Sequence, residues 1–393
     1  MRICLFTPTF LPSLGGAERM ADTLARGLTE RGHALCVLAP RPRPDAGPAP
    51  EARHPSPGSP GLPYAVARYR RPPAQHLWPE LLAWRLRRLH RRWPFDVVLA
   101  FYAYPTGYAA TRAARRLRTP VVVTPRGADL YPLFHALRKP RVKATIAAGY
   151  RDADRIVSIS NWLTQRIVQV TGRTLEQLPP IDAVPNGIDL QAFDADLAAA
   201  DPGRLPLDED TPFLLHMGRV VPVKQVDVAV KAVARCAAAL RERGVRYAIV
   251  GDGADLEPLR AQIAQQHLSD TVLTLGRRSG AERAWLLRHA RGFVTASREE
   301  GMPNAVLEAM AAGLPTLASD IGPHRELLED RGWGLLHRAG DPEDLAQRLL
   351  QLLDTPAAPL REAALALREH YTLEKTIAGY EAACQKALAS RRL

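Results

Sequence analysis

The sequence contains no apolar run of about 18 residues, the shortest length that spans a bilayer as a helix. It has only four cysteines, which are scattered and form no Cys-x-x-Cys pair or Cys/His cluster. That spacing argues against a zinc site and fits a reducing cytosol. The apolar start carries one arginine, two prolines and no small-residue cleavage site. We therefore expect a buried first strand there instead of a signal peptide.

Acidic residues are scarce in the first half of the chain. Residues 1–190 hold 28 of the 53 Lys and Arg but only 13 of the 41 Asp and Glu, and the net charge of the whole chain is +12. In the densest basic stretch, 67–94, leucines and Trp84 interleave with arginines. This stretch predicts a basic amphipathic helix that can lie on an anionic membrane surface, or else a plain solvated helix. Because no nucleic-acid recognition motif accompanies the charge, no nucleic-acid partner is expected.

The chain has 393 residues, too long for one ordinary core, and short apolar runs alternate with helical stretches in both halves. Strands are expected at 2–7, 34–39, 95–101, 120–124, 154–160 and 181–185, and again at 213–218, 246–251, 271–276, 292–297 and 314–319. The alternation predicts an α/β protein with two Rossmann-like domains, each built on a doubly wound parallel sheet. The expected limits are 1–190 and 191–370, followed by a helical segment 371–393. Nine prolines in 40–63 predict an extended surface loop.

Two glutamates flank a turn in "SREEGMPNAVLEAMAAGLPTLAS", residues 297–319. Gly301 and Pro303 prevent a helix from running through from Glu300, and Pro303 suits a first helical position. Glu308 then lies inside the helix and leans back toward the N-terminus, the end that attracts anions. A carboxylate beside an anion site suits a ligand that carries both phosphate and paired hydroxyls. The motif predicts a site for a sugar–diphosphate–nucleoside; the alternative is a capped helix with two solvated glutamates.

Two cations follow the expected strand 213–218. Arg219 and Lys224 are five residues apart on a loop that enters a helix, and a diphosphate needs cations for strong, charge-assisted hydrogen bonds. Ligands bind at the carboxyl edge of doubly wound sheets, where both cations and Glu300 are expected. "IVGDGADLEPL" mimics a dinucleotide fingerprint, but Leu256 replaces the third glycine, which disfavours an oxidoreductase. The Asp-x-Asp triplets fall in helical or linker stretches, so no metal or other cofactor is expected.

Several segments together carry a family resemblance: "GGAERMADTLARGL", "VPNGID", "HMGRVVPVKQVD", "IVGDGADLEPL" and "EEGMPNAVLEAMAAGLPTLAS". They resemble the retaining nucleotide-sugar glycosyltransferases of family 4, within glycosyl transferases group 1. The resemblance covers nearly the whole chain and implies the GT-B fold, in which two Rossmann-like domains face a cleft. It implies that the second domain holds the nucleotide-sugar donor and the first the acceptor. It also implies that the helices at 371–393 pack back on the first domain.

The resemblance implies roles for individual residues. Arg219 and Lys224 would hold the diphosphate, Glu308 the ribose and Glu300 the donor sugar; the first two and Glu300 are the expected catalytic residues. Further donor-binding residues would be Gly16, Gly218, Arg277, Gly301, Met302, Pro303 and Asn304. On the acceptor side the resemblance points to Gly15, Arg126, Asp129 and Asn186. Many relatives carry a histidine in the element where this chain has Arg126, which leaves the role of that arginine open.

We therefore expect a metal-independent, retaining hexosyltransferase. Its donor would be a UDP-, GDP- or ADP-linked sugar, and its acceptor a sugar, a lipid-linked molecule or a glycan in cell-envelope or polysaccharide synthesis. The expected location is cytoplasmic, or peripheral on the cytosolic face of a bacterial inner membrane. A nucleotide-sugar epimerase or phosphorylase on the same fold, and a non-catalytic membrane-surface binding protein, remain as alternatives.

Overall fold

The computed structural model describes residues 1–12, 15–42, 63–71, 78–132, 135–329 and 331–391. The chain forms two compact units: unit 1 is Met1–Asn186 with Glu374–Leu393, and unit 2 is Gly187–Leu373. The sequence places the corresponding limits at 190 and 370, so the chain leaves unit 1 four residues earlier and returns three residues later. Most of the proline-rich stretch 40–63 lies outside the described residues.

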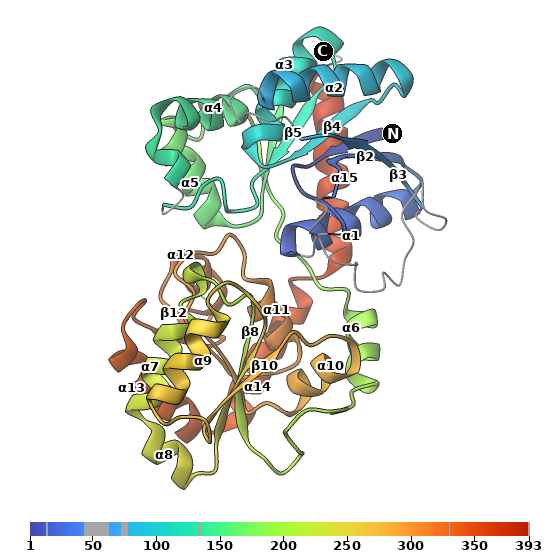
Figure 1. Cartoon of the computed structure of the whole chain (residues 1–393). Coiled ribbons are helices and arrows are strands. Elements are labelled where there is room, and N and C mark those ends of the chain that lie inside the picture. The colour runs from blue at the N-terminus through green and yellow to red at the C-terminus, as the bar shows by residue number, and fades with distance from the viewer. Residues whose placement is uncertain (13–14, 43–62, 72–77, 133–134, 330, 392–393) are drawn as a thin grey trace. The chain divides into compact units, whose positions relative to one another are not determined.

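Unit 1 is built on a seven-stranded parallel sheet of order β3-β2-β1-β4-β5-β6-β7 (Figure 1). Its strands are β1 (Arg2–Phe6), β2 (Ala34–Pro40), β3 (Ala65–Tyr69), β4 (Val97–Phe101), β5 (Val121–Thr124), β6 (Arg155–Ser158) and β7 (Ile181–Ala183). Its helices are α1 (Gly16–Glu30), α2 (Trp78–Arg92), η2 (Ala103–Gly107), α3 (Tyr108–Leu117), η3 (His135–Arg138), α4 (Pro140–Arg151), α5 (Asn161–Thr171) and all but the first residue of α15 (Leu373–Ser390).

Unit 2 is built on a six-stranded parallel sheet of order β10-β9-β8-β11-β12-β13. Its strands are β8 (Phe213–Met217), β9 (Arg246–Val250), β10 (Val272–Gly276), β11 (Gly292–Thr295), β12 (Thr316–Ser319) and β13 (Leu335–His337). Its helices are α6 (Leu190–Ala198), η4 (Pro222–Lys224), α7 (Val226–Arg235), α8 (Ala237–Glu242), α9 (Leu256–Gln265), α10 (Gly280–His289), α11 (Asn304–Ala311), α12 (Gly322–His324), η5 (Arg325–Glu329), α13 (Pro342–Asp354), α14 (Ala357–Leu365) and η6 (Ala366–Glu369). The predicted pair of doubly wound parallel sheets is confirmed.

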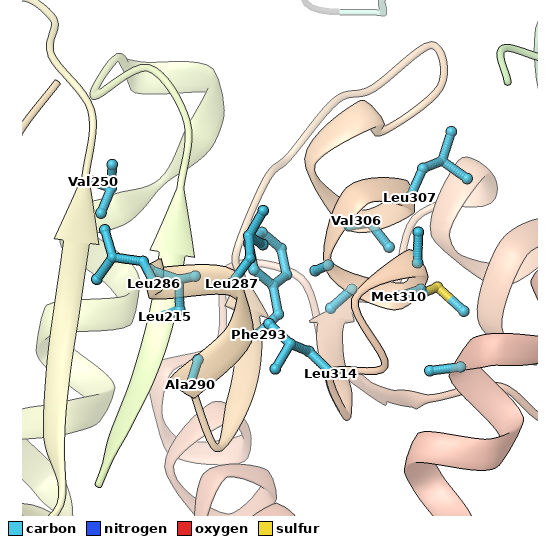
Figure 2. Close-up of a cluster of buried hydrophobic side chains, with 14 of the residues drawn as sticks. Leu215, Val250, Leu286, Leu287, Ala290, Phe293, Val306, Leu307, Met310 and Leu314 are labelled. Carbon is cyan, nitrogen blue, oxygen red and sulfur yellow. The ribbon is translucent and has the colours of Figure 1, made fainter. Parts of the chain in front are cut away.

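The strands of unit 2 are apolar on both sides because helices cover both faces of the sheet. In β8, Phe213 and Leu215 point into one buried cluster, while Leu214 between them joins the other. The first cluster lies between the sheet and the helices α10 and α11, and Figure 2 shows Phe293 of β11 at its centre. Helices α7 and α13 pack on the other face. Apolar side chains therefore fill both faces of the sheet, and polar side chains that could bind a ligand are expected at the ends of the strands.

Two strands were not expected from the sequence. β3 and β13 are both edge strands, and each has only one neighbour in its sheet. Their burial is incomplete, and β3 includes Arg68 among its few residues. Arg68 interrupts the apolar residues of β3, and β13 has only three residues, so neither has the continuous apolar run of the central strands.

The C-terminal helix α15 packs against unit 1. A Cβ on Gly27 of α1 would lie 2.1 Å from Ile377 Cδ1, so the Ile377 side chain packs directly on the backbone of α1. The Tyr380 hydroxyl lies 2.9 Å from Thr124 Oγ1 at the end of β5. Glu381 accepts a bond from Arg31 Nη1 at 2.8 Å. No helix among the described residues is long and apolar enough to cross a membrane.

Candidate active site

Two neighbouring strands of unit 2 deliver polar loops to one edge of the sheet. β8 ends at Met217 and is followed by Gly218, Arg219 and the short helix η4, which ends with Lys224. β11 is followed by the loop that carries Glu300. The backbone N–H of Arg298 in that loop donates to the carbonyl of Val223 at 2.8 Å, which ties the two loops together. We call Arg219, Lys224, Glu300 and Glu308 the β8–β11 site.

Lys224 and Glu300 form an ion pair at the centre of this edge. Only 12% of the Glu300 side chain and 20% of the Lys224 side chain are exposed, so the charges are screened little by water. Burial raises the pKa of Glu300. The charge of Lys224, with hydrogen bonds from Lys224 and Ser297, outweighs burial and holds the pKa of Glu300 below its ordinary value. Glu300 is therefore an ionised acceptor at neutral pH.

Glu308 pairs with a different cation from the one that pairs with Glu300. It lies in α11 and forms an ion pair with Arg283 of α10, and neither side chain is more than 29% exposed. Arg283 is a residue that the sequence did not single out. The helix α11 begins at Asn304 with Pro303 as the preceding cap residue, so the prediction of Pro303 at the first helical position was wrong by one residue. The Pro303 carbonyl instead accepts the N–H of Leu307 at 3.1 Å, which starts the helix.

The turn between the two glutamates is largely buried. Gly301 and Pro303 are buried, while Met302 is half-buried and packs against the apolar cluster of unit 2. Asn304 is half-buried at the first position of α11. The turn thus joins the apolar interior to the polar edge, and its predicted contact with donor sugar and phosphate stays a prediction.

The remaining predicted donor-side cations are exposed. Arg219, directly after β8, is exposed, and the structure records no ion pair for it among the described residues. Arg277, directly after β10, is exposed as well. Both side chains follow carboxyl ends of strands, the edge at which ligands bind in doubly wound sheets. Arg219 is thus available to an anionic ligand without breaking a protein contact.

Two buried histidines flank the Lys224–Glu300 pair, and the sequence analysis missed both. His216 on β8 donates from Nδ1 to the Val294 carbonyl at 3.2 Å, and His324 donates from Nδ1 to the Ser319 carbonyl at 2.8 Å. The only sequence signal was a histidine inside an apolar strand at His216. Burial lowers the pKa of each ring to about 4, with the charge of Lys224 acting in the same direction. Both rings are therefore neutral at pH 7 and leave Lys224 as the local cation.

The glycines of the motif after β9 serve backbone packing. A Cβ on Gly251 would lie 1.7 Å from the Gly218 carbonyl oxygen, and one on Gly253 would lie 2.1 Å from that of Val220. Gly218 N–H donates to Val250 O, and Val220 N–H to Asp252 O, each at 2.9 Å. These glycines hold the loop with Gly218 and Arg219 in place, which accounts for the motif without a dinucleotide.

In unit 1, Gly15 and Gly16 begin the helix α1. Gly15 is the cap residue in an extended conformation, and the Arg19 N–H donates to its carbonyl at 3.1 Å. A Cβ on Gly15 would meet the Glu18 carboxylate at 2.4 Å. Glu18 therefore folds back over the N-terminus of its own helix, and no side chain larger than glycine fits at position 15 without moving it.

Arg126 and Asn186, predicted on the acceptor side, lie in the interior of unit 1. Arg126 Nη2 donates to Asn186 Oδ1 at 3.0 Å, and Nη1 donates to the Tyr380 hydroxyl at 3.3 Å. The guanidinium also lies over the ring of Phe101 at 5.0 Å. These contacts join β4, the loop after β5, the segment after β7 and α15. Direct contact of either residue with an acceptor stays a prediction.

Asp129 is buried in the same unit. Its Oδ2 accepts the Ala103 N–H at 2.8 Å and the Tyr150 hydroxyl at 3.0 Å, whereas Oδ1 has no hydrogen-bond partner among the described residues. Burial raises the pKa of Asp129 to about 6, although the hydrogen bonds from Ala103 and Tyr150 act against it. Asp129 therefore anchors the start of η2, and its predicted acceptor role is untested.

Unit 2 also has a hollow of about 370 Å³ beside the edge strand β13. Its lining includes Asp320, His337 and Arg348, but none of the four residues of the β8–β11 site. Asp320 is already paired with Arg325. The hollow is thus separate from the β8–β11 site.

Two Rossmann-like units in one chain, with cations and carboxylates at the carboxyl edge of the second, define a class of two-domain α/β proteins with charged groups where doubly wound sheets bind ligands. Comparison with protein families makes the class specific. The model described as Glycosyl transferases group 1 matches residues 199–367, and that of Glycosyltransferase Family 4 matches residues 14–192. The chain belongs to the group 1 glycosyltransferases of GT-B fold, and it is a glycosyltransferase.

Individual relatives agree with this assignment. The chain is 25% identical over 398 residues to the N-acetyl-alpha-D-glucosaminyl L-malate synthase of Bacillus anthracis, covering 95% of this chain and 94% of that protein. It is 27% identical over 355 residues to a GDP-mannose-dependent alpha-mannosyltransferase of Mycobacterium tuberculosis, covering 87% and 85%. These relatives carry different named activities, so they share the reaction class without sharing one substrate.

Solved structures share the fold. A sucrose-phosphate synthase of Thermosynechococcus elongatus aligns with a TM-score of 0.79 at 18% identity over 99% of both chains. Anabaena HepE in complex with UDP aligns with a TM-score of 0.76 at 21% identity, over 99% of this chain and 100% of that one. At these identities the likeness establishes the GT-B architecture.

Proposed function

We propose that the protein transfers a glycosyl unit from a nucleoside-diphosphate sugar to an acceptor hydroxyl with retained anomeric configuration. The observation that carries this proposal is the partly buried Lys224–Glu300 ion pair beside the exposed Arg219, at the carboxyl ends of two adjacent strands. It is supported by a relative named as GDP-mannose-dependent and by a fold neighbour solved in complex with UDP.

Each charged group has a task in this proposal. Arg219 and Lys224 bind the diphosphate and stabilise the negative charge that grows on it as the bond to the sugar breaks. Glu300 is ionised, because its pKa is lowered, and it accepts hydrogen bonds from hydroxyls of the donor sugar. Glu308 accepts hydrogen bonds from the ribose. Arg277 contacts the base in this proposal.

In this proposal retention comes from substitution on one face of the donor sugar, without a covalent bond to the protein. Glu300 is held by Lys224, so it is a poor nucleophile toward the anomeric carbon. The bond from that carbon to the diphosphate oxygen breaks, and the acceptor oxygen forms a new bond on the same face. The acceptor proton passes to an oxygen of the leaving diphosphate. Since Arg219 and Lys224 supply positive charge to the diphosphate, we propose that no metal is required, and EDTA should leave the rate unchanged.

The test is a screen of UDP-, GDP- and ADP-linked sugars by thermal shift, followed by NMR analysis of the glycoside produced. A stabilising donor and a product with the anomeric configuration of that donor are expected. A product of inverted configuration would overturn retention. An epimerised nucleotide sugar, or phosphorolysis with no glycoside formed, would overturn the reaction and favour the epimerase or phosphorylase alternative.

We also propose that the acceptor is presented at an anionic membrane surface. On α2, Leu82 and Leu86 are buried, whereas Leu81 and Trp84 are 38% and 41% exposed. Arg88 lies over the Trp84 ring at 5.5 Å. An exposed leucine and tryptophan beside arginines form the pattern of a helix that lies in a membrane interface. A lipid-linked acceptor in cell-envelope synthesis fits this surface.

Binding to vesicles tests the membrane proposal. The wild type should partition to vesicles containing an anionic lipid and not to purely zwitterionic ones, and a Leu81→Ser/Trp84→Ser variant should lose this partition. Leu175→Ser is the matched control, because Leu175 is also an exposed leucine of unit 1. Equal partition of the wild type to both vesicles, or equal loss in the control, would contradict the proposal.

A further inference from the structure

We propose that Arg283 is a positioning residue that fixes the Glu308 carboxylate for recognition of the ribose, and thereby sets the preference of the enzyme for ribonucleotide donors. This inference rests on the proposed function, in which Glu308 contacts the ribose. Arg283 itself acts through Glu308 and need not touch the ligand.

The first support is the way α10 and α11 are held. Leu286 and Leu287 of α10 share one buried cluster with Val306 and Leu307 of α11 (Figure 2). Figure 2 shows the two helices on either side of Phe293 of β11. Because close packing fixes both helices against the sheet, the Cα atoms of Arg283 and Glu308 are held in place by the core. The pair is therefore built into the fold of unit 2.

The second support is the contact itself. The Arg283 guanidinium meets Glu308 Oε2, and the side chains are 19% and 29% exposed. The Nη2 group makes no hydrogen bond of good geometry, so the contact is mainly between charges. Oε1, the other oxygen of the carboxylate, has no recorded partner among the described residues. Arg283 thus contacts one oxygen of the Glu308 carboxylate, and the other oxygen can accept hydrogen bonds from hydroxyl groups.

The third support is that this cation is not already committed along its own helix. Arg278, which lies just before α10, pairs with Glu282 of that helix. Arg283 instead reaches a carboxylate on another helix. A free glutamate side chain samples many rotamers, and binding would have to freeze them. Arg283 removes that freedom before the ligand arrives.

Matched nucleotides test the inference. For whichever of UDP, GDP and ADP binds, calorimetry would compare the ribonucleotide with its 2′,3′-dideoxy counterpart. The wild type should prefer the ribonucleotide by about 10- to 100-fold, the factor of one or two charge-assisted hydrogen bonds. Arg283→Gln should lose most of this preference for the ribonucleotide, and Glu308→Gln should lose it too. Arg283→Lys should retain much of it, because the contact is between charges.

Two controls separate positioning from a general loss of structure. Arg235→Gln removes another ion pair of unit 2, that with Glu343, and should leave the ratio unchanged. In a Glu308→Gln background, Arg283→Gln should have no further effect on the ratio. Thermal unfolding would check that each variant folds, and Arg283→Lys keeps the test open if Arg283→Gln does not.

The outcomes are distinguishable. A wild-type preference that survives Arg283→Gln would overturn the inference and leave the proposed function intact. Additive losses from Arg283→Gln and Glu308→Gln would overturn it too, because Arg283 would then act independently of Glu308. If no nucleoside diphosphate binds the wild type, the proposed function fails and the inference fails with it.

Discussion

At the scale of single residues, the candidate site consists of charges whose partners are already present. Lys224 neutralises Glu300, and Arg283 neutralises Glu308, so neither carboxylate is a bare buried charge. Removing one partner of a buried pair leaves the other uncompensated, which is the costly case. Each side chain therefore affects both the chemistry and the local stability, and experiments must separate the two.

Lys224→Ala should lower turnover by about 10²–10³, the usual loss when one group that stabilises transition-state charge is removed. Steady-state kinetics with the donor identified in the screen would measure it. Lys231→Ala is the control, because Lys231 forms an exposed pair with Asp227 and should keep wild-type turnover. Turnover near the wild-type value in the folded Lys224→Ala variant would show that the diphosphate is not held by this lysine.

The buried histidines predict a pH dependence of stability. Because the pKa of His216 and of His324 is lowered to about 4 in the folded chain, the unfolded chain binds more protons between about pH 4 and 6.5. The unfolding midpoint should therefore fall as the pH drops through that window. Asp129, whose pKa is raised to about 6, acts in the opposite direction. Because the pKa of Glu300 is lowered in the folded chain, its contribution to the free energy of unfolding is lost only at still lower pH.

Thermal midpoints at pH 7 and pH 5 would measure this effect in the wild type and in His324→Gln. The variant should have a lower midpoint at pH 7 but a smaller drop between the two values, since one titrating ring is gone. A variant with an unchanged drop would show that His324 is not the source of the acid sensitivity.

At the scale of elements, the sequence predicts strands that have a continuous apolar run, but it does not predict short strands that lack one. The central strands β8 and β11 are apolar on both faces and were predicted from their runs. The strands β3 and β13 were not, because Arg68 interrupts β3 and β13 has only three residues. Glu300, Glu308, Arg219 and Lys224 stand out by spacing. Arg283 does not, because its link to Glu308 exists only once α10 and α11 pack together.

Residue roles in unit 1 were harder to predict. Asp129 and Arg126 look like surface groups in a turn-rich segment, but each lies in the interior with protein partners. Nothing local in the sequence shows that the side chain of Tyr380, about 250 residues later, packs in the same region. Long-range packing decides this, and a single sequence carries no record of it.

The loop after β9 should be intolerant of a methyl group. Gly251→Ala should destabilise the fold and weaken nucleotide binding, because the added Cβ would meet the Gly218 carbonyl and displace Arg219. Gly244→Ala is the matched control: its φ of +65° is also positive, yet nothing lies within 4 Å of the added atom. It should cost only the backbone strain of about 1–2 kcal/mol. Thermal midpoints and calorimetry would compare them, and equal effects would contradict the packing role.

At the scale of the whole molecule, each of the two units closes its own core, and the chain passes between them twice, after Asn186 and after Leu373. Unit 2 carries the β8–β11 site at one sheet edge, and unit 1 carries most of the positive charge and the exposed Leu81 and Trp84 of α2. That one unit binds the donor and the other the acceptor stays a prediction. The group 1 family assignment shows the reaction class, while the base, the sugar and the acceptor must come from ligand experiments.

The most direct measurement is a calorimetric titration of UDP, GDP and ADP into the wild type and into Arg219→Ala. Arg219 is exposed and has no recorded ion pair among the described residues, so its truncation should leave the fold intact. One diphosphate should bind the wild type, and the variant should bind it about 10- to 100-fold more weakly. If none of the three nucleotides binds the wild type, or if the variant binds as tightly as the wild type, the diphosphate does not bind at the β8–β11 site.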